Sequence, residues 1–324
     1  MKKVLRSAAG AFAARSGLLS SCERAARGEL SILCYHRILP GAQRARYHTP
    51  NLVVTPEAFQ MHCRALAERY RVLPLAEAFD VWKNGAPQDR PLAAMTFDDG
   101  YRDNARYAAP ILKASGLRAT FYVIAGLVDR DELPWYDVVG NAHRGNGEQH
   151  LAGTAEAALE KAKRLSPAER EALVAGLRAS VRPSDDDALI MTAAQVKSLA
   201  DDGHEIGSHT MTHPLLPQCD DVELEREVVD SKAILSAVTG RSVPGLCFPN
   251  GDQDARVRRA AAAAGYAHAV TMMPGLNDRQ KDDVFALRRW FISEDGLSDG
   301  SGKPSETLLR MEICGLSRRM FRRD

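Results

Sequence analysis

The 324-residue sequence predicts an α/β fold in which about seven parallel strands form a barrel with a helical insertion. Short apolar runs alternate along the chain with longer segments that carry helix start and stop signals. Such alternation is typical of a parallel sheet covered by helices, and seven or eight strand–helix units favour a barrel over an open sheet. The residues that could carry chemistry follow the predicted strands, and in a barrel those strand ends converge on one face.

The predicted strands are short and largely apolar. They lie at residues 32–35, 93–97, 119–124, 205–208, 245–248, 267–270 and 287–292. The helices between them have readable ends, such as Pro56 at a first helical position and Gly240 just after a last one. We expect these helices at residues 56–69, 101–115, 192–203, 220–239 and 252–264.

The segment 126–190 interrupts this alternation, because it contains no predicted strand but a charged, Ala-rich helical stretch at 154–182. A long insertion on a barrel loop lies beside the active face and commonly shapes substrate binding. Trp135 and Tyr136 stand at its start and are candidates for stacking against a sugar ring. The alternative is that they pack the insertion onto the barrel.

Composition places the chain among soluble globular proteins, with 45% hydrophobic and 26% charged residues. A formal net charge of +1 gives no argument for nucleic-acid binding, so we expect none. The six cysteines form no C-x-x-C pair and are interpreted as reduced thiols of an intracellular protein, although an even count leaves disulfides open.

Both ends of the chain are basic and partly apolar. We interpret residues 1–29 as a helical extension and not as a signal peptide. Their apolar run is too short and too interrupted for a signal peptide. We therefore expect a cytoplasmic protein, with a secreted form as the alternative. In the tail, 296–324, four apolar residues lie at helical spacing, and arginines surround them. The apolar residues are Leu309, Ile313, Leu316 and Met320. Such a helix can contact an anionic membrane peripherally or simply pack on the barrel.

Two adjacent carboxylates, Asp98 and Asp99, end the predicted strand at 93–97. Neighbouring side chains on a strand point to opposite faces, so these two diverge unless the strand stops at Gly100. If it stops there, both reach one site, where one carboxylate can bind a metal ion and the other can accept a proton. The alternative is an ordinary Asp-Gly turn.

Two histidines, His209 and His213, stand four residues apart after the apolar segment around Ile206. On a helical turn such residues share a face, and Pro214 limits that turn to a brief one. Two imidazoles and one carboxylate make a three-ligand catalytic zinc set that leaves one position open for water. Together with the carboxylate pair, they predict a site for Zn²⁺ or another divalent transition metal.

Three motifs resemble those of the polysaccharide deacetylases, carbohydrate esterase family 4, which share the chitooligosaccharide deacetylase domain. The motifs are T-F-D-D-G-Y at 96–101, S-H-T-M-T-H-P at 208–214 and F-P-N-G at 248–251. The resemblance covers residues 30–295 and implies a distorted (β/α) barrel that removes N- or O-acetyl groups from sugars. It implies Asp98 as the catalytic base and Asp99, His209 and His213 as the metal ligands.

Two departures from the family pattern concern the residues around the base. Many members carry R-x-P-x-G in the third motif, where the Arg orients the catalytic Asp, whereas this chain has Cys247. Arg289 is a candidate replacement from another strand, unless it pairs with a surface carboxylate. The late L-x-H motif that supplies the general acid is missing after residue 268.

The segment S-I-L-C-Y-H-R-I offers a histidine at the end of the first predicted strand instead. It resembles the subset of the family, including poly-N-acetylglucosamine deacetylases, in which the acid His is permuted to that strand. This resemblance implies His36 as the general acid. The alternative is a strand-end histidine without chemistry, since a lone His is a weak signal.

The predicted chemistry is metal-dependent hydrolysis of an acetyl amide or ester. A metal ion lowers the pKa of bound water, Asp98 takes a proton from that water, and His36 protonates the leaving sugar nitrogen. A backbone N–H at Asn250 helps to hold the oxyanion. The expected substrate is an acetylated sugar of a polysaccharide, oligosaccharide or glycolipid precursor. A non-catalytic carbohydrate-binding relative and a hydrolase of a non-sugar amide remain alternatives.

Overall fold

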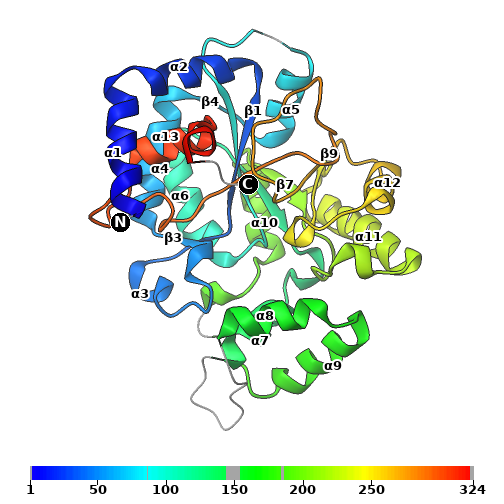
Figure 1. Ribbon diagram of the computed structural model, residues 1–324. Helices are drawn as coiled ribbons and strands as arrows, with labels where there is room; N and C mark the ends of the chain where they lie inside the picture. The colour runs from blue at the N-terminus through cyan, green and yellow to red at the C-terminus, as the bar shows by residue number, and fades with distance from the viewer. Residues whose placement is uncertain (1, 86, 144–153, 184–185, 322–324) are drawn as a thin grey trace.

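The computed structural model describes residues 2–85, 87–143, 154–183 and 186–321, and its centre is a curled, eight-stranded parallel sheet (Figure 1). Seven strands follow the order β10-β1-β5-β6-β7-β8-β9, and β4 pairs with β5 beside this path. The strands are β1 Leu30–Tyr35, β4 Arg71–Val72, β5 Leu92–Phe97, β6 Thr120–Val123, β7 Glu205–Ser208, β8 Gly245–Cys247, β9 His268–Val270 and β10 Trp290–Phe291. A separate short pair is formed by β2 Arg37–Ile38 and β3 Val53–Val54.

The segment that carries β10 joins the two edges of the sheet. Leu287 exchanges hydrogen bonds with β9, because its N–H donates to Ala269 and its carbonyl accepts from Thr271. A few residues later the Ile292 N–H donates to the carbonyl of Cys34 in β1. The curled sheet is therefore a distorted (β/α) barrel, as predicted, and every predicted strand coincides with an observed one.

Helices cover the outside of the sheet (Figure 1). The helices of this layer are α4 Pro56–Arg69, α6 Ala109–Ala114, α10 Ala193–Asp201, α11 Asp221–Thr239 and α12 Ala255–Ala263, and each falls where the sequence predicts one. The predicted helix at 101–115 contains a π-helical turn at Asn104–Ala108, near its start. A short α3, Gly41–Arg44, follows β2.

One helix that the sequence analysis did not identify, α5 at Leu75–Lys83, closes one end of the barrel. Leu75, Phe79 and Trp82 pack in one buried cluster with the barrel interior. The backbone N–H of Leu75 donates to Thr120 Oγ1, at the start of β6, at 2.8 Å. This end therefore holds the amino-terminal ends of the strands, and any site at their carboxyl ends lies on the other side.

The insertion projects from the barrel as three helices, which Figure 1 shows at the lower end of the molecule. They are α7 Trp135–Ala142, α8 Ala155–Arg164 and α9 Pro167–Arg178. The predicted helical stretch at 154–182 is confirmed and consists of two helices, α8 and α9. Ser166 forms a capping box with Glu169, and Pro167 occupies the first position of α9.

The two ends of the chain pack on each other. The N-terminal segment forms α1 Lys2–Arg15 and α2 Leu18–Ala25, and the tail forms α13 Glu306–Ile313 and α14 Leu316–Phe321. Arg310 of α13 holds the carboxylate of Glu23 in α2 through two hydrogen bonds of 2.8 Å. Leu309, Ile313 and Leu316 are buried, so the predicted apolar face of the tail packs on the protein up to Leu316.

Further along the tail, Arg322 and Arg323 lie outside the described residues. Among the described residues, no helix combines the length and apolar character that crossing a bilayer requires. All six cysteines are buried free thiols.

Candidate active site

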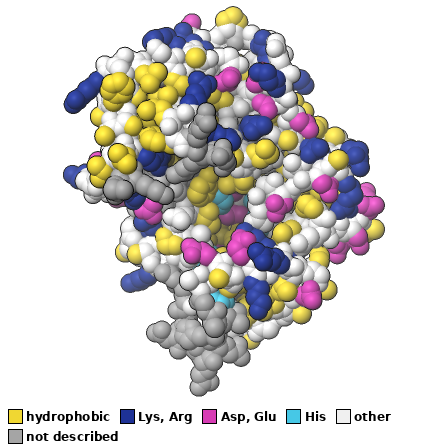
Figure 2. Space-filling model, in the orientation of Figure 1, with side chains coloured by type: hydrophobic (Ala, Val, Ile, Leu, Met, Phe, Trp, Pro, Cys, Tyr) yellow, Lys and Arg dark blue, Asp and Glu magenta, His cyan; other side chains and the backbone are white. Residues whose placement is uncertain are grey.

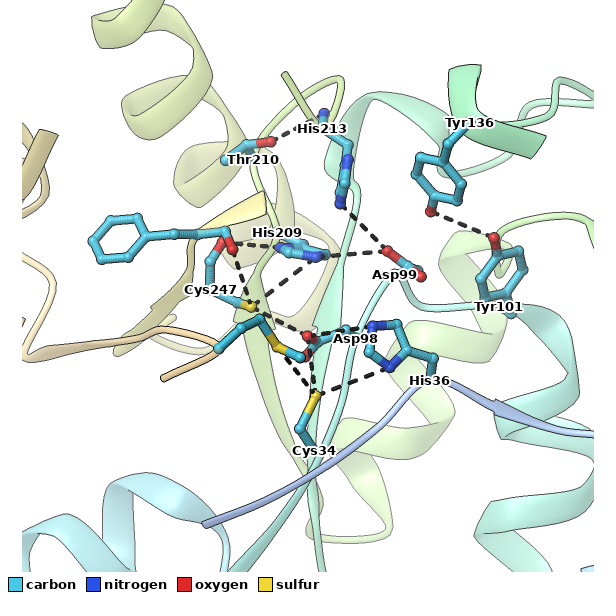
Figure 3. A network of polar contacts seen from close by, with 12 residues as sticks. Cys34, His36, Asp98, Asp99, Tyr101, Tyr136, His209, Thr210, His213 and Cys247 are labelled. Carbon is cyan, nitrogen blue, oxygen red and sulfur yellow. Dashed lines mark hydrogen bonds and ion pairs between the residues drawn. The ribbon is translucent and has the colours of Figure 1, made fainter. Parts of the chain in front are cut away.

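The two adjacent carboxylates follow β5 at a sharp change of backbone direction. Asp99 has φ 73° and Gly100 has φ 79°, so two consecutive residues adopt the left-handed conformation. A Cβ on Gly100 would lie 3.0 Å from the Cα of Val123, and glycine is therefore required here. The strand stops as predicted, and Figure 3 shows both carboxylates in one site, with Asp98 directed toward His36 and Asp99 toward His209 and His213.

The two histidines come from the loop after β7. The spacing of the two histidines predicts a short helical turn at 209–213, and this prediction is wrong, because Thr210 has φ 67° and His213 has φ 61°. Glu227 of α11 holds the loop, because its carboxylate accepts hydrogen bonds from the backbone N–H groups of Met211 and Thr212 at 2.8 and 2.9 Å. Left-handed turns, and not helical periodicity, bring the imidazoles together.

The donor atoms of the three predicted metal ligands converge. Nε2 of His209 lies 3.5 Å and Nε2 of His213 lies 3.6 Å from Oδ1 of Asp99 (Figure 3). Four ligands in tetrahedral geometry at the usual zinc distances stand about 3.4 Å apart, so this spacing fits a divalent ion. Nδ1 of His209 lies 2.9 Å from the carbonyl of Cys247, which assigns the proton to Nδ1 and leaves the Nε2 lone pair facing Asp99.

Burial sets the charge of this donor set. It lowers the pKa of both His209 and His213, so both imidazoles are neutral near pH 7, the form that binds metals. Burial, followed by the charge of Asp98, raises the pKa of Asp99 well above its ordinary value. No permanent cation contacts Asp99 among the described residues. A bound divalent cation would provide the missing positive charge, so the residues present fit such an ion.

Asp98, in contrast, is paired with a buried guanidinium. Nη1 and Nη2 of Arg289 donate to its two carboxylate oxygens at 2.6 and 2.7 Å. Arg289 is itself held by Nε donating to the Thr271 carbonyl at 2.9 Å and by Thr96 Oγ1. Burial acts to raise the pKa of Asp98, but the charge and hydrogen bonds of Arg289 outweigh it, and the pKa lies below its ordinary value.

Three sulfur atoms surround the pair of Asp98 and Arg289, and they belong to Cys34, Cys247 and Met272. Cys34 and Met272 are not among the site residues predicted from the sequence. Sγ of Cys34 and Sγ of Cys247 lie 3.4 and 3.5 Å from Oδ2 of Asp98. Cys247 and Met272 each place sulfur 3.2 Å from Nη2 of Arg289. Cys247 occupies the position at which the third motif implies an Arg, and its short side chain lies against the guanidinium of Arg289, just before β10.

His36 lies on the other side of Asp98, after β1. Its Nε2 is 3.9 Å from Oδ2 of Asp98, and its side chain is 13% exposed, more than either carboxylate (Figure 3). Burial lowers the pKa of His36 to about 4, with the charge of Asp98 acting in the opposite direction. Cys34, two residues earlier on the same strand face, could have been placed beside it from the period of two.

Asn250 lies in a tight turn after β8, with φ 55°. The N–H groups of Gly251 and Asp252 close this turn by donating to Phe248 and Pro249. The Asn250 N–H is not one of the donors that close the turn.

Trp135 and Tyr136 of α7 occupy different environments. Trp135 is 9% exposed and its indole N–H donates to the His213 carbonyl at 2.8 Å, so it packs beneath the loop and offers little surface to a ligand. The Tyr136 ring contacts His213 edge-on with 4.8 Å between centroids, and its hydroxyl acts to lower the pKa of Asp99. The structure thus brings Tyr136, but not the face of Trp135, to the predicted metal ligands.

A buried hydrogen-bond network that the sequence analysis missed supports Tyr136. Asp137 accepts from the hydroxyl groups of Tyr101 and Tyr47 at 2.7 and 2.9 Å and interacts with His48 Nε2 at 2.7 Å. The Tyr101 hydroxyl lies 3.4 Å from that of Tyr136. The insertion is therefore fixed to the barrel at the strand end that carries Asp99.

Comparison with known proteins agrees with this geometry. The family described as polysaccharide deacetylase matches residues 85–269, which include both carboxylates and both histidines. The chain belongs to the polysaccharide deacetylase family. Family membership makes it a deacetylase, a hydrolase acting on carbon–nitrogen bonds. His36 and Arg289 lie outside the matched residues, so their positions rest on the geometry described above.

Individual relatives are distant in sequence. YxkH of Bacillus subtilis (strain 168), which bears the name of a polysaccharide deacetylase, is 25% identical over 266 residues, covering 82% of this chain and 72% of its own. The Streptococcus pyogenes deacetylase PplD, solved in complex with acetate, aligns with TM-score 0.62 and 22% identity over 88% of this chain and 98% of its own. IcaB from Ammonifex degensii aligns with TM-score 0.57 and 18% identity over 83% and 93%. The two structures establish a shared fold.

Proposed function

We propose that this deacetylase removes the acetyl group from an N-acetylated sugar by metal-dependent hydrolysis. The observation that supports this most is the contrast within the site: three convergent neutral or acidic donors stand beside a carboxylate that a guanidinium keeps ionised. The first set suits a divalent cation, and the second suits a base that does not compete for it.

Asp99, His209 and His213 would hold the ion, most suitably Zn²⁺, because mixed nitrogen and oxygen ligation matches its preference. When bound, a divalent ion polarises the acetyl carbonyl and lowers the pKa of water at its open position. The protein's part is to hold His209 in the correct tautomer, through the Cys247 carbonyl, and to place the Tyr136 hydroxyl where it lowers the pKa of Asp99.

Asp98 is the base in this proposal, and His36 is the acid. Asp98 accepts a proton from the attacking water, and the proton then passes to His36, whose Nε2 lies 3.9 Å from the carboxylate. Burial lowers the pKa of His36 to about 4, whereas at Asp98 the guanidinium of Arg289 outweighs burial and lowers the pKa. His36 can therefore be neutral in the resting site and still protonate the leaving sugar nitrogen.

The turn at Asn250 would contribute a backbone donor for the oxyanion. Its N–H is not used to close the turn, and a backbone role places no demand on the side chain. Tyr136 is the aromatic residue of the insertion placed to contact a sugar, because its ring borders His213 at the site. We propose an N-acetylated sugar of a polysaccharide, oligosaccharide or glycolipid precursor as the substrate.

Acetate release tests this function. Purified protein is stripped of metal with a chelator, reloaded with Zn²⁺, and incubated with N-acetylated and O-acetylated sugars and with a non-sugar acetamide. We expect acetate from an N-acetylated sugar, loss of activity on stripping, and recovery on reloading. Full activity in the metal-free protein would contradict the metal-dependent mechanism, and release from the non-sugar acetamide alone would support the hydrolase of a different amide.

A further inference from the structure

The outer face of α1 carries an apolar surface that the rest of the protein leaves uncovered. Val4, Leu5 and Phe12 are 58%, 60% and 65% exposed. The opposite face of the helix is anchored, because a Cβ on Gly10 would lie within 3.3 Å of side-chain atoms of Thr307 and Met311 in α13. The helix is thus held in place by one side while its other side presents large apolar groups to solvent.

The last helix of the tail extends this surface. Met320 and Phe321 of α14 are 39% and 37% exposed, and Leu18 at the start of α2 is 42% exposed. Nη1 of Arg319 lies 4.0 Å from Sγ of Cys22, which places α14 beside α2. We call the exposed face of α1, α2 and α14 the terminal surface. Figure 2 shows apolar side chains gathered there, bordered by Lys and Arg.

Basic side chains predominate on the terminal surface, and Glu29 lies close to Arg319 at its edge. Glu23 is the single acidic residue between positions 2 and 28, and it is buried and paired with Arg310. The exposed basic side chains are Lys3, Arg15, Arg24, Arg318 and Arg319. At its edge Lys3 lies 3.8 Å from Asp295. Since the whole chain has a net charge of only +1, this basic character is a local property.

We propose that the terminal surface binds an anionic lipid bilayer, with Leu5 and Phe12 entering the interface and the arginines contacting lipid phosphates. A helix with an apolar exposed face and basic residues along its borders has the composition of an interfacial helix. A second copy of the same surface fits less well, because a symmetric contact would bring arginines against arginines.

The inference does not rest on the proposed reaction, because none of these residues contacts the site. Figure 2 shows the terminal surface on the same face as the hollow that contains histidine and carboxylate side chains. Binding would therefore leave the substrate opening near the membrane, whichever acetylated sugar enters it.

Vesicle co-sedimentation of the full-length protein tests the proposal. We expect binding to vesicles of equimolar phosphatidylcholine and phosphatidylglycerol, no binding to phosphatidylcholine alone, and release by salt. Replacing Arg15, Arg24 and Arg319 by Gln should weaken binding by roughly fivefold per charge. The matched control replaces the same number of exposed basic residues on the insertion, Lys161, Arg164 and Arg182, by Gln and should bind as the wild type does.

The apolar contribution is tested separately with Leu5→Ser and Phe12→Ser together. The control is Val222→Ser with Val229→Ser, two exposed residues of α11 that are 77% and 41% accessible. We expect only the first pair to lose vesicle binding, with acetate release from a soluble sugar unchanged in both. Absent binding, equal binding to both vesicle types, or a dimer that the first pair dissociates would overturn the proposal.

Discussion

Asp98 and Asp99 are adjacent in the chain and nearly equally buried, at 2% and 3% exposure, yet they face differently built halves of the site. Asp98 faces a guanidinium that is fixed by its own hydrogen bonds and surrounded by sulfur. Asp99 faces two neutral imidazoles and a tyrosine hydroxyl, and its pKa is raised. One half carries its own cation, whereas the other needs a cation from outside, and this difference assigns the two roles.

The largest effects should come from replacing each of the two carboxylates in turn. Asp99→Ala should lose the metal and the activity together, because one of the three donors is removed. Asp98→Asn should keep the metal and lower turnover by about 10²–10⁴, the usual worth of a positioned base. Bound zinc is measured by elemental analysis and turnover by acetate release. Equal metal content in the two variants would contradict the assignment, and His143→Ala, directly after α7, is a histidine control that should retain both properties.

The second effect concerns His36, the proposed general acid beside Asp98. His36→Ala should retain the metal, because the residue lies on the Asp98 side, and should lower kcat by about 10²–10⁴. Imidazole added to the assay can act as a replacement proton donor. It should restore part of the rate in His36→Ala and none in Asp98→Asn. A rate close to wild type in His36→Ala would transfer the acid role to another group.

Replacing Arg289 should have a smaller effect, which is seen in the pH–rate profile. In Arg289→Gln, burial is no longer opposed by the guanidinium, so the pKa of Asp98 rises. The base must be ionised, and the acid limb of the pH–rate profile should therefore move to higher pH. Arg289→Lys keeps the charge but not the bidentate geometry, and should show a smaller shift.

The lowered pKa of Asp98 should also affect the free energy of unfolding and its dependence on pH. The depressed pKa of Asp98 contributes stability that is present above its unfolded value of about 3.9 and is lost as the pH falls toward the folded value. In Arg289→Gln this contribution should disappear, and the buried uncompensated carboxylate should lower the free energy of unfolding by about 3–5 kcal/mol. An unchanged pH profile in a folded Arg289→Gln protein would show that Arg289 does not control Asp98.

The two halves also differ in how far the sequence predicts them. Asp99, His209 and His213 occur in short motifs next to apolar runs, so strand ends and ligand chemistry were enough to group them. The partner of Asp98 was only a candidate, because Arg289 is 191 residues away and its pairing depends on how the last strand closes the barrel. The same holds for α5 and for the Asp137 network, which depend on packing between distant segments.

Local conformation was the other gap. The spacing of His209 and His213 suggested a helical turn, yet the loop uses left-handed residues held by Glu227 from α11. Periodicity describes an isolated helix, and here tertiary hydrogen bonds to the Glu227 carboxylate hold a different backbone conformation. The convergence of the donor atoms was thus expected from their chemistry, while the path of the chain that produces it was not.

The smallest effect should come from Tyr136, which tests the Asp99 half without removing a ligand. Its hydroxyl lowers the raised pKa of Asp99, so Tyr136→Phe should raise that pKa further. A higher pKa of Asp99 strengthens the competition between protons and the ion, so zinc affinity should fall by up to about 10–100-fold, and the loss should shrink as the pH increases. Titration calorimetry at several pH values measures both the affinity and the proton release. Tyr266→Phe, which removes a buried hydroxyl bonded to Val228, is the control and should leave zinc affinity unchanged. A loss of affinity that does not vary with pH would mean that Tyr136 supports the site by packing against His213, and not by tuning Asp99.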